Sequence, residues 1–190
     1  MKKNLLTAFL MTIATTILLG IIYPLVITGL AQIFFRDKAN GQIITRNGEA
    51  IGSRIIGQPF TSAKYFHPRP SNAGNGYDAA NSGGTNYAST NQKLIDRVRA
   101  DAATLHQENP AEPIPVDLVT TSASGLDPEI SPAAAEFQVP RISRERGLPE
   151  SLLRELIQKH TDQRDLGLLG EPRVNVLELN LALDELTHKP

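Results

Sequence analysis

The sequence contains no cysteine and no tryptophan, and aromatic residues make up only 5% of it. Without cysteine, the chain has no disulfide, no thiol nucleophile and no cysteine-ligated zinc. Basic and acidic residues nearly balance, and the formal net charge is −1. Proteins that bind nucleic acids through phosphate contacts need a basic surface, so this balance argues against a nucleic-acid partner.

Signals for metal binding or catalysis are also sparse. His67, His106, His160 and His188 are scattered, and no two of them have the spacing of metal ligands. The glycine-rich stretch 72–84 lacks the Gly-Lys-Ser/Thr ending of a phosphate-binding loop. We therefore expect no metal site and no catalytic residues, and no cofactor bound by the chain itself.

The feature that is present is an apolar run over residues 5–35 without one Asp, Glu, Lys, Arg or His. A helix needs about 20 apolar residues to cross the hydrocarbon core of a bilayer. In lipid the backbone must pair its own polar groups, which a single segment achieves as a helix. The sequence therefore predicts a short N-terminal flank (1–4), a transmembrane helix (5–35) and one water-facing domain (36–190).

A cleaved signal peptide is the alternative interpretation of the apolar run. Gly29 and Ala31 resemble the small residues of a cleavage site. However, the hydrophobic part of a signal peptide is about 7–15 residues long, much shorter than this run. We expect the segment to stay uncut and to anchor the domain in the membrane.

Charge counting does not fix the orientation of this anchor. Lys2 and Lys3 precede the apolar run, but Arg36 and Lys38 follow it closely. A short flank before a long apolar run fits a signal anchor that translocates the domain after it. We expect a cytoplasmic N-terminus and an extracytoplasmic domain.

Small residues recur at every fourth position of the apolar run. Residues four apart lie on one side of a helix, and small residues there let a second helix approach closely. The proline in the series removes a backbone donor and is expected to kink the helix. We predict a face that packs against a partner helix, made of Ala8, Thr12, Thr16, Gly20, Pro24 and Thr28.

The domain after the anchor has a net charge of −3, because setting aside Lys2 and Lys3 leaves 17 basic against 20 acidic residues.

Residues 42–45 and 50–56 flank Asn47-Gly48, a strong hairpin signal. Residues 65–89 are rich in Pro, Gly, Asn and Ser and predict one long loop, and loops of that length are usually functional or disordered.

The rest of the domain alternates helix and strand signals, which predicts one mixed α+β or α/β domain. A helix is expected after Thr90 or Asn91, with Leu94, Ile95, Val98, Ala102 and Leu105 on its buried side. Further expected elements are a strand at 116–120, a helix capped by Ser131 and running through Phe137, a helix at 141–146, a helix opened by Pro149, a strand at 173–177 and a helix through Leu179, Leu183 and Leu186.

Two neighbouring serines are candidate nucleophiles. Ser122 and Ser124 lie in Thr-Ser-Ala-Ser-Gly, which is neither a Gly-x-Ser-x-Gly elbow nor a Ser-x-x-Lys motif. Catalytic triads form in space rather than in sequence, so a membrane-anchored serine hydrolase stays as an alternative. A local turn at Asp127-Pro128, with the serines bonded to nearby backbone, is the favoured interpretation.

Several segments together resemble one family, the C subunit of the Kdp high-affinity potassium-transporting ATPase. The single N-terminal anchor and the total length agree with that family, so the resemblance covers nearly the whole chain. The serine-rich segment and the Gly-Glu-Pro-Arg-Val-Asn segment are specific. The matching segments are Gly57–Phe60, Tyr65–Ser71, Asp117–Pro128, Arg164 and Leu169–Leu177.

This resemblance implies an accessory subunit of a bacterial inner-membrane complex with an A subunit that selects potassium, a P-type ATPase B subunit and a small F subunit. It implies a catalytic chaperone that raises the ATP affinity of the B subunit, with its domain over the outer mouth of the A subunit. The family-motif residues that it marks as candidate partner contacts are Gln58, Tyr65, Phe66, Arg69, Pro70, Ser71, Ser122, Ser124, Gly125, Asp127, Gly170, Glu171, Arg173 and Asn175.

The predicted topology constrains this expected role. With the N-terminus in the cytoplasm, the large domain cannot touch cytoplasmic ATP, so any effect on ATP affinity must be transmitted indirectly as a coupling free energy. ATP and K⁺ would then be handled by the partner subunits. A stand-alone extracytoplasmic binding module is the remaining alternative, and it would not co-purify with large membrane proteins.

Overall fold

The computed structural model describes residues 2–187 and divides the chain into two compact units that meet at Ile43 and Ile44. Met1 and residues 188–190 lie outside the described residues, and so His188 and the ends of the predicted 1–4 and 36–190 segments do too.

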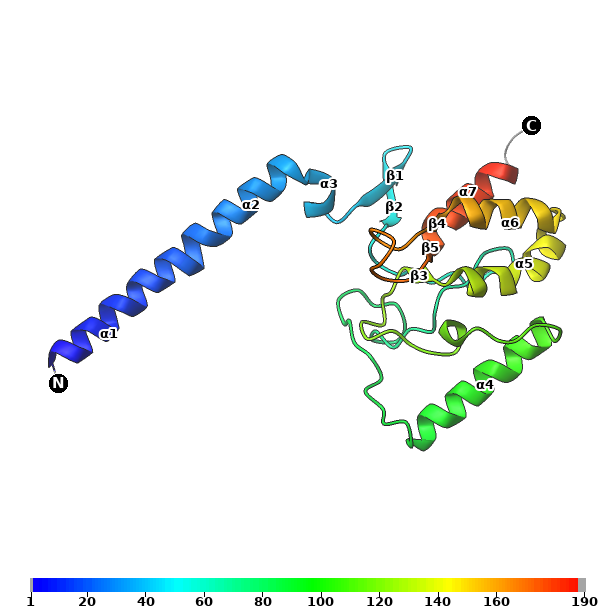
Figure 1. Ribbon diagram of the computed structural model, residues 1–190, viewed down its shortest axis with the longest axis horizontal. Helices are drawn as coiled ribbons and strands as arrows, with labels where there is room; N and C mark the ends of the chain where they lie inside the picture. The colour runs from blue at the N-terminus through cyan, green and yellow to red at the C-terminus, as the bar shows by residue number, and fades with distance from the viewer. Residues whose placement is uncertain (1, 188–190) are drawn as a thin grey trace. The chain divides into compact units, whose positions relative to one another are not determined.

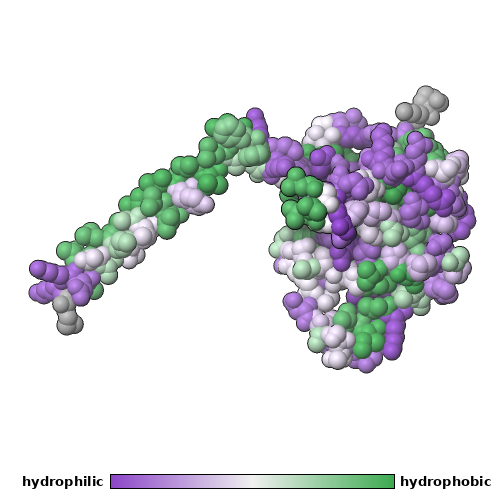
Figure 2. Space-filling view, viewed as in Figure 1, coloured by the Kyte–Doolittle hydropathy of each residue, from purple (hydrophilic) through white to green (hydrophobic). Residues whose placement is uncertain are grey.

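The first unit is dominated by one continuous helix, Lys2–Phe34, which is long and apolar enough to cross a membrane. It consists of α1 (Lys2–Thr15), a π-helical stretch (Thr16–Ile22) and α2 (Tyr23–Phe34), and none of its residues is buried within the chain. Figure 2 shows the apolar side chains lying along the outside of this helix. The prediction of a single apolar helix is confirmed, and a short helix, α3 (Arg36–Ala39), follows it.

The helix adapts to Pro24 by a local change of hydrogen-bond register. In a regular α-helix the proline ring clashes with the carbonyl four residues earlier, which here belongs to Gly20. Gly20 lies inside the π-helical stretch, and Tyr23 N–H bonds to the carbonyl of Leu18, five residues back. A kink was predicted at Pro24, and the feature that the structure shows there is a π-helical stretch that begins about two turns before it.

A hairpin links the helix to the domain. Strands β1 (Ile43–Arg46) and β2 (Glu49–Ser53) form a two-stranded sheet. The turn residues Asn47 and Gly48 both have positive φ, 54° and 85°. These angles match the tight turn that suits the right-handed twist of two strands, so the hairpin prediction is confirmed.

The domain core lies where three helices meet a small antiparallel sheet (Figure 1). The sheet has the order β3-β5-β4, from β3 (Glu129–Ile130), β5 (Arg173–Asn175) and β4 (Thr161–Asp162). The helices are α5 (Pro132–Arg146), α6 (Glu150–Lys159) and α7 (Val176–Thr187). The largest fully buried apolar side chains are Phe66, Val139, Ile142, Leu153, Ile157, Val174, Leu179 and Leu183. The predicted mixed helix and sheet domain is confirmed.

Helix α4 (Gln92–Glu108) lies at the edge of the domain, and none of its residues is buried. Its N-cap is Asn91, whose side chain accepts a hydrogen bond from the Lys93 N–H at 2.9 Å. Leu105 packs against the core only in part. The start of this helix agrees with the prediction, while its apolar side is only half covered.

Two predicted elements were wrong. Residues 116–118 form a 3₁₀ turn (Val116–Leu118) instead of a strand, because the Asp117 carboxylate accepts bonds from the N–H (2.7 Å) and hydroxyl (3.1 Å) of Ser131. The helices expected up to Phe137 and at 141–146 are one helix, α5, with Pro140 inside it. Its N-cap Ser131 and its end at Arg146 agree with the prediction, and its C-cap is Gly147 (φ 66°).

Candidate functional site

The second family segment, Tyr65–Ser71, forms a strap over the core that side chains of two helices hold in place. Phe66 is fully buried, and its backbone N–H and C=O bond to the side-chain amide of Asn180 in α7, at 2.8 and 2.9 Å. His67 bonds in the same way to Gln138 in α5, at 2.7 and 3.1 Å. Two side-chain amides thus replace the neighbouring strand that an extended segment would otherwise need.

Tyr65 joins this strap to the last helix. Its hydroxyl donates to the Asp184 carboxylate at 3.1 Å, and the Arg146 guanidinium lies 4.7 Å from the centre of its ring. Arg146 also pairs with Asp184 at 2.8 Å. Tyr65 is therefore held by a hydrogen bond to one member of an ion pair and a cation–π contact with the other, which favours a structural role.

Below the strap, the second and third family segments are joined to each other. Arg69 pairs with Asp127 at 2.8 Å, and the Ser71 hydroxyl donates to the Gly125 carbonyl at 2.6 Å. A Cβ on Gly125 would lie 2.6 Å from the Gly83 carbonyl oxygen, and the φ of this glycine is 69°. The long loop 65–89 and the 122–128 turn are therefore one packed unit.

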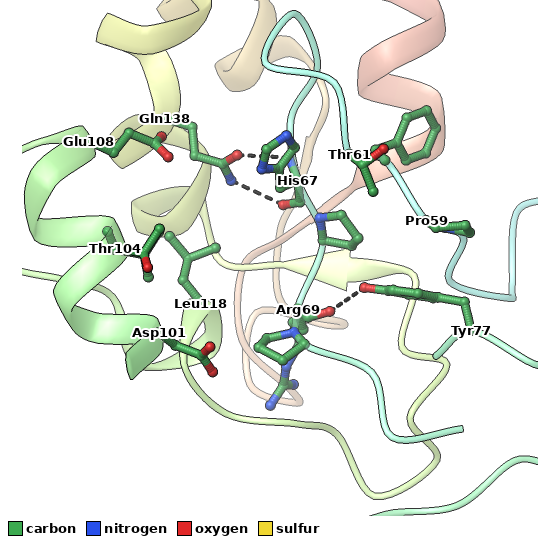
Figure 3. Close-up of a pocket in the computed structure, with 14 residues that line it drawn as sticks. Pro59, Thr61, His67, Arg69, Tyr77, Asp101, Thr104, Glu108, Leu118 and Gln138 are labelled. Atoms are coloured by element: carbon green, nitrogen blue, oxygen red, sulfur yellow. Dashed lines mark hydrogen bonds between the residues drawn. The ribbon is translucent and has the colours of Figure 1, made fainter. Parts of the chain in front are cut away.

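A cavity of about 410 Å³ lies between this unit and α4 (Figure 3). Its ionisable side chains are already paired: Glu108 with Arg141 at 2.8 Å, and Asp101 with Arg97 at 2.8 Å. The remaining wall is largely prolines and apolar groups. The residues that line it are Pro59, Phe60, Thr61, His67, Pro68, Arg69, Pro70, Tyr77, Asp101, Thr104, Leu105, Glu108, Leu118 and Gln138. Both carboxylates on the cavity wall are therefore engaged with arginines of the same domain.

Two side chains on the cavity wall have shifted pKa values. Burial, reinforced by the positive charge of Arg141, lowers the pKa of His67 below its ordinary value, and its Nε2 lies 3.0 Å from the Ser62 carbonyl oxygen. Burial raises the pKa of the Tyr77 hydroxyl, which donates to the Arg69 carbonyl. Both shifts favour the neutral forms of these two side chains.

The geometry around the two serines does not form a catalytic triad. The Ser122 and Ser124 hydroxyls lie 3.4 Å apart, and the Ser124 oxygen also accepts the Leu126 N–H at 3.1 Å. Among residues 2–187, neither hydroxyl bonds to a histidine or a carboxylate. The local turn interpretation fits this arrangement, because a serine nucleophile needs an adjacent base.

The last family segment lies on the central strand of the sheet. Arg173 donates to Glu129 on β3 at 3.0 Å, and Asn175 donates to the Arg54 carbonyl at 2.7 Å. Burial raises the pKa of Glu129, although Arg173 beside it acts in the opposite direction. Gly170 and Glu171 lie on the exposed turn before β5.

Gln58 is a candidate contact whose surroundings are unusual. Its side chain packs against Gly52, where an added Cβ would overlap the Gln58 amide. Its Nε2 atom is buried, and no group within residues 2–187 accepts a hydrogen bond from it. The absence of a side chain at Gly52 leaves the space that the Gln58 amide occupies.

Sequence reasoning missed the residues that hold the strap. Gln138 and Arg141 in α5 and Asn180 in α7 are buried polar side chains, and none was marked as a candidate partner contact. The only available signal was a polar residue on an otherwise apolar helix side, as for Asn180 between Leu179 and Leu183. Such residues are rare in cores unless they bond to a partner.

The candidate packing face of the first unit is exposed along its length. Thr12 folds its hydroxyl back to the Ala8 carbonyl at 2.9 Å, while Thr16 and Gly20 both lie in the π-helical stretch. In a regular α-helix, four residues make slightly more than one full turn. A π-helix has more residues per turn, so four residues there make slightly less than one full turn. The line through Ala8, Thr12, Thr16, Gly20, Pro24 and Thr28 is therefore straighter than on a regular α-helix.

Within residues 2–187, no group of three or more His, Asp or Glu side chains is arranged to hold a metal ion. Segments distant in the sequence are tied together by side-chain amides and ion pairs.

Comparison with known proteins gives one consistent result. The family model described as K⁺-transporting ATPase, c chain (KdpC) matches residues 5–185. A protein of Koribacter versatilis named potassium-transporting ATPase KdpC subunit is 68% identical over 184 residues, which cover 97% of this chain and 95% of that protein. Proteins with the same name from Acidobacterium capsulatum (97% and 99% covered) and Mycobacterium tuberculosis (98% and 100% covered) are 56% and 52% identical. With a match over almost its whole length and relatives this similar, the chain belongs to the KdpC family, the c chain of the K⁺-transporting ATPase.

Proposed function

We propose that this chain is a non-catalytic accessory subunit of an ATP-driven, high-affinity potassium import complex. The observation that carries the proposal is the family match over residues 5–185. In this role the chain assembles and stabilises a complex of the potassium-selecting A subunit, the ATP-hydrolysing B subunit and the small F subunit. Potassium and ATP are handled by these partners, and the chain itself binds no cofactor.

The location that goes with this role is the bacterial inner membrane. The chain crosses it once, with residues 1–4 in the cytoplasm and the domain 36–190 on the periplasmic side. The continuous apolar helix Lys2–Phe34 supports a single crossing. The net charge of −3 beyond the anchor argues against a domain that is held on anionic lipid.

The chain acts as a catalytic chaperone by raising the ATP affinity of the B subunit through indirect coupling. A tenfold change in affinity requires only about 1.4 kcal/mol of coupling free energy. Packing of one membrane helix against a neighbour is sufficient for a term of that size. The coupling then runs through the anchor or through the A subunit, without contact between the domain and nucleotide.

The test of this role is a comparison of complexes with and without the chain. We expect the full-length chain to co-purify with the other subunits in mild detergent, and its omission to lower the apparent ATP affinity of K⁺-stimulated hydrolysis about tenfold. A nucleotide photolabel should modify the B subunit and leave residues 36–190 unlabelled. Labelling of the domain in an intact complex would contradict indirect coupling.

The absence of cysteine makes the topology directly testable. Single cysteines at the exposed positions Asn4 and Glu145 can be probed with a membrane-impermeant maleimide on intact, outer-membrane-permeabilised cells. We expect Glu145→Cys to react and Asn4→Cys to react only after the inner membrane is opened. The reverse pattern would place the domain in the cytoplasm.

A further inference from the structure

The turn between β4 and β5 is a small structure with its own order, which we call the leucine tip (residues 164–171). The backbones of Asp165 and Leu169 exchange two hydrogen bonds, each 2.9 Å long. Arg164 and Glu171 form an ion pair across its base. The tip is thus held in shape by its own bonds rather than by contact with the core.

The apolar side chains of the leucine tip are unusually exposed. Leu166 is 90% exposed, Leu168 82% and Leu169 63%. A single exposed leucine on a protein surface is ordinary, but several together mark an interaction surface. Three leucines within four positions form such a patch.

The backbone adds a second, independent indication. Leu166 has a φ of 54° and Gly167 has a φ of 72°. The left-handed region suits glycine or asparagine, and a leucine there is disfavoured. Leu166 therefore has neither a conformational nor a burial advantage within the domain, so its value to the protein must come from a contact outside it.

Charge around the tip argues against a lipid surface as the partner. Asp165 and Glu171 have side chains that are 72% and 76% exposed, and Asp162 is exposed nearby. The positive charges of Arg164 and Arg173 neutralise only part of this negative charge. Anionic headgroups attract basic segments, so exposed carboxylates beside the leucines favour a protein groove with basic edges.

Area argues against a second copy of the chain or a freely diffusing partner. A stable independent interface buries about 800 Å² on each partner, which is more than three leucine side chains can expose. A contact this small is sufficient only when the two proteins are already held close together. A shared membrane provides that proximity, because tethering raises the effective concentration of the two surfaces.

We propose that the leucine tip inserts into an apolar groove, edged by basic side chains, on a neighbouring membrane subunit of the same potassium-transporting complex. The proposal rests on the proposed function, which supplies the neighbouring subunit. It assigns Leu166, Leu168 and Leu169 as the anchor residues of that contact, with Asp165 and Glu171 at its polar edge.

The first experiment locates the tip in the assembled complex. A single cysteine at exposed Gln163, beside the tip, carries a benzophenone label in the otherwise cysteine-free full-length chain. Irradiation of the purified complex should join the chain to another subunit of the complex. Products with lipid alone, with a second copy of the chain, or no product at all would overturn the proposal.

The second experiment removes the leucines. The variant Leu166→Asn, Leu168→Ser, Leu169→Ser should lower the Gln163 crosslink yield and the fraction of chain retained on the complex at least tenfold. Val116→Ser, which changes a valine that is 70% exposed elsewhere on the domain, should leave both unchanged. Unchanged retention of the triple variant would overturn the proposal.

Two controls distinguish a loss of docking from a loss of folding and from a failure of the proposed function. The triple variant should melt no earlier than the parent chain, since Leu166→Asn replaces a leucine with a residue that tolerates positive φ. If the parent chain itself fails to co-purify with the transporter subunits, the proposed function fails and the docking proposal with it. A parent complex that forms without any crosslink from the tip defeats the docking proposal alone.

Discussion

The side-chain amide of Asn180 closes a ring of two hydrogen bonds with the backbone of Phe66. Its oxygen accepts the Phe66 N–H at 2.8 Å, and its nitrogen donates to the Phe66 C=O at 2.9 Å. Both residues are at most 1% exposed, so water cannot replace either bond. The helix α7 therefore fixes the strap that carries the Tyr65–Ser71 family segment.

Asn180→Ala should destabilise the domain strongly. The change leaves a buried N–H and a buried C=O of Phe66 without partners, and each such group costs about 1–3 kcal/mol. We expect a loss of about 2–6 kcal/mol in the free energy of unfolding, measured by urea titration of the full-length chain in detergent. Gln158→Ala, on the exposed side of α6, is the control and should change stability by less than about 0.5 kcal/mol. Equal losses in both variants would contradict the structural role of Asn180.

The elements that the sequence predicts well are those whose signals are local. The apolar run at 5–35 needs no partner to be recognised as a helix, and Asn47-Gly48 specifies its turn through its own backbone preferences. Asn91 and Ser131 are N-caps of their helices, and both residue types are strongly preferred at that position. In each case the residues that decide the structure lie within a few positions of one another.

The elements that were missed depend on distant partners. Strands β3 and β4 are two residues long and exist only because both pair with β5. The Val116–Thr120 run is rich in strand-forming residues, but the bonds between Asp117 and Ser131 outweigh that preference. One helix was expected through Phe137 and another at 141–146, whereas buried neighbours such as Val139 and Ile142 hold one helix together around Pro140.

The candidate site shows the same difference between features set by local signals and features set by distant partners. The family segments could be marked from the sequence, but the side chains that position them could not. Gln138 is 71 residues from His67, and Asn180 is 114 residues from Phe66. The contact between such segments follows from the packed fold rather than from any local pattern.

Gly125→Ala should disrupt the junction between the long loop and the 122–128 turn. Its new Cβ would lie 2.6 Å from the Gly83 carbonyl oxygen and 2.7 Å from the Ala73 nitrogen, at a φ of 69°. Because both neighbours are backbone atoms, we expect a loss of more than about 2 kcal/mol in unfolding free energy. Gly147→Ala is a matched control, since its φ is 66° but nothing lies within 4 Å of its added Cβ. It should cost only about 1 kcal/mol, from the backbone conformation, and a similar cost at both glycines would contradict the close approach at Gly125.

The lowered pKa of His67 predicts that stability depends on pH. The folded domain holds this imidazole neutral more firmly than the unfolded chain does, because burial and Arg141 both disfavour its charge. The stabilising contribution is therefore present above the unfolded pKa of about 6.5 and is lost as pH falls through the lower folded pKa. Urea midpoints between pH 8 and pH 5 should fall with acid, and His67→Gln should fall less steeply. Parallel pH profiles for the parent and the variant would rule out His67 as the source.

Gly20→Leu should weaken the association of the anchor with a partner helix. Gly20 lies on the face of small residues, inside the π-helical stretch, where a leucine would hold another helix away. Gly29 is nine residues further along, roughly on the opposite side of a regular helix, and an added Cβ there meets nothing within 4 Å. In complexes purified through a tag on another subunit, we expect Gly20→Leu to reduce the retained chain severalfold and Gly29→Leu to leave it unchanged. Since both variants keep the helix equally apolar, a difference between them reports contact on one face, and equal retention would mean that this face meets only lipid.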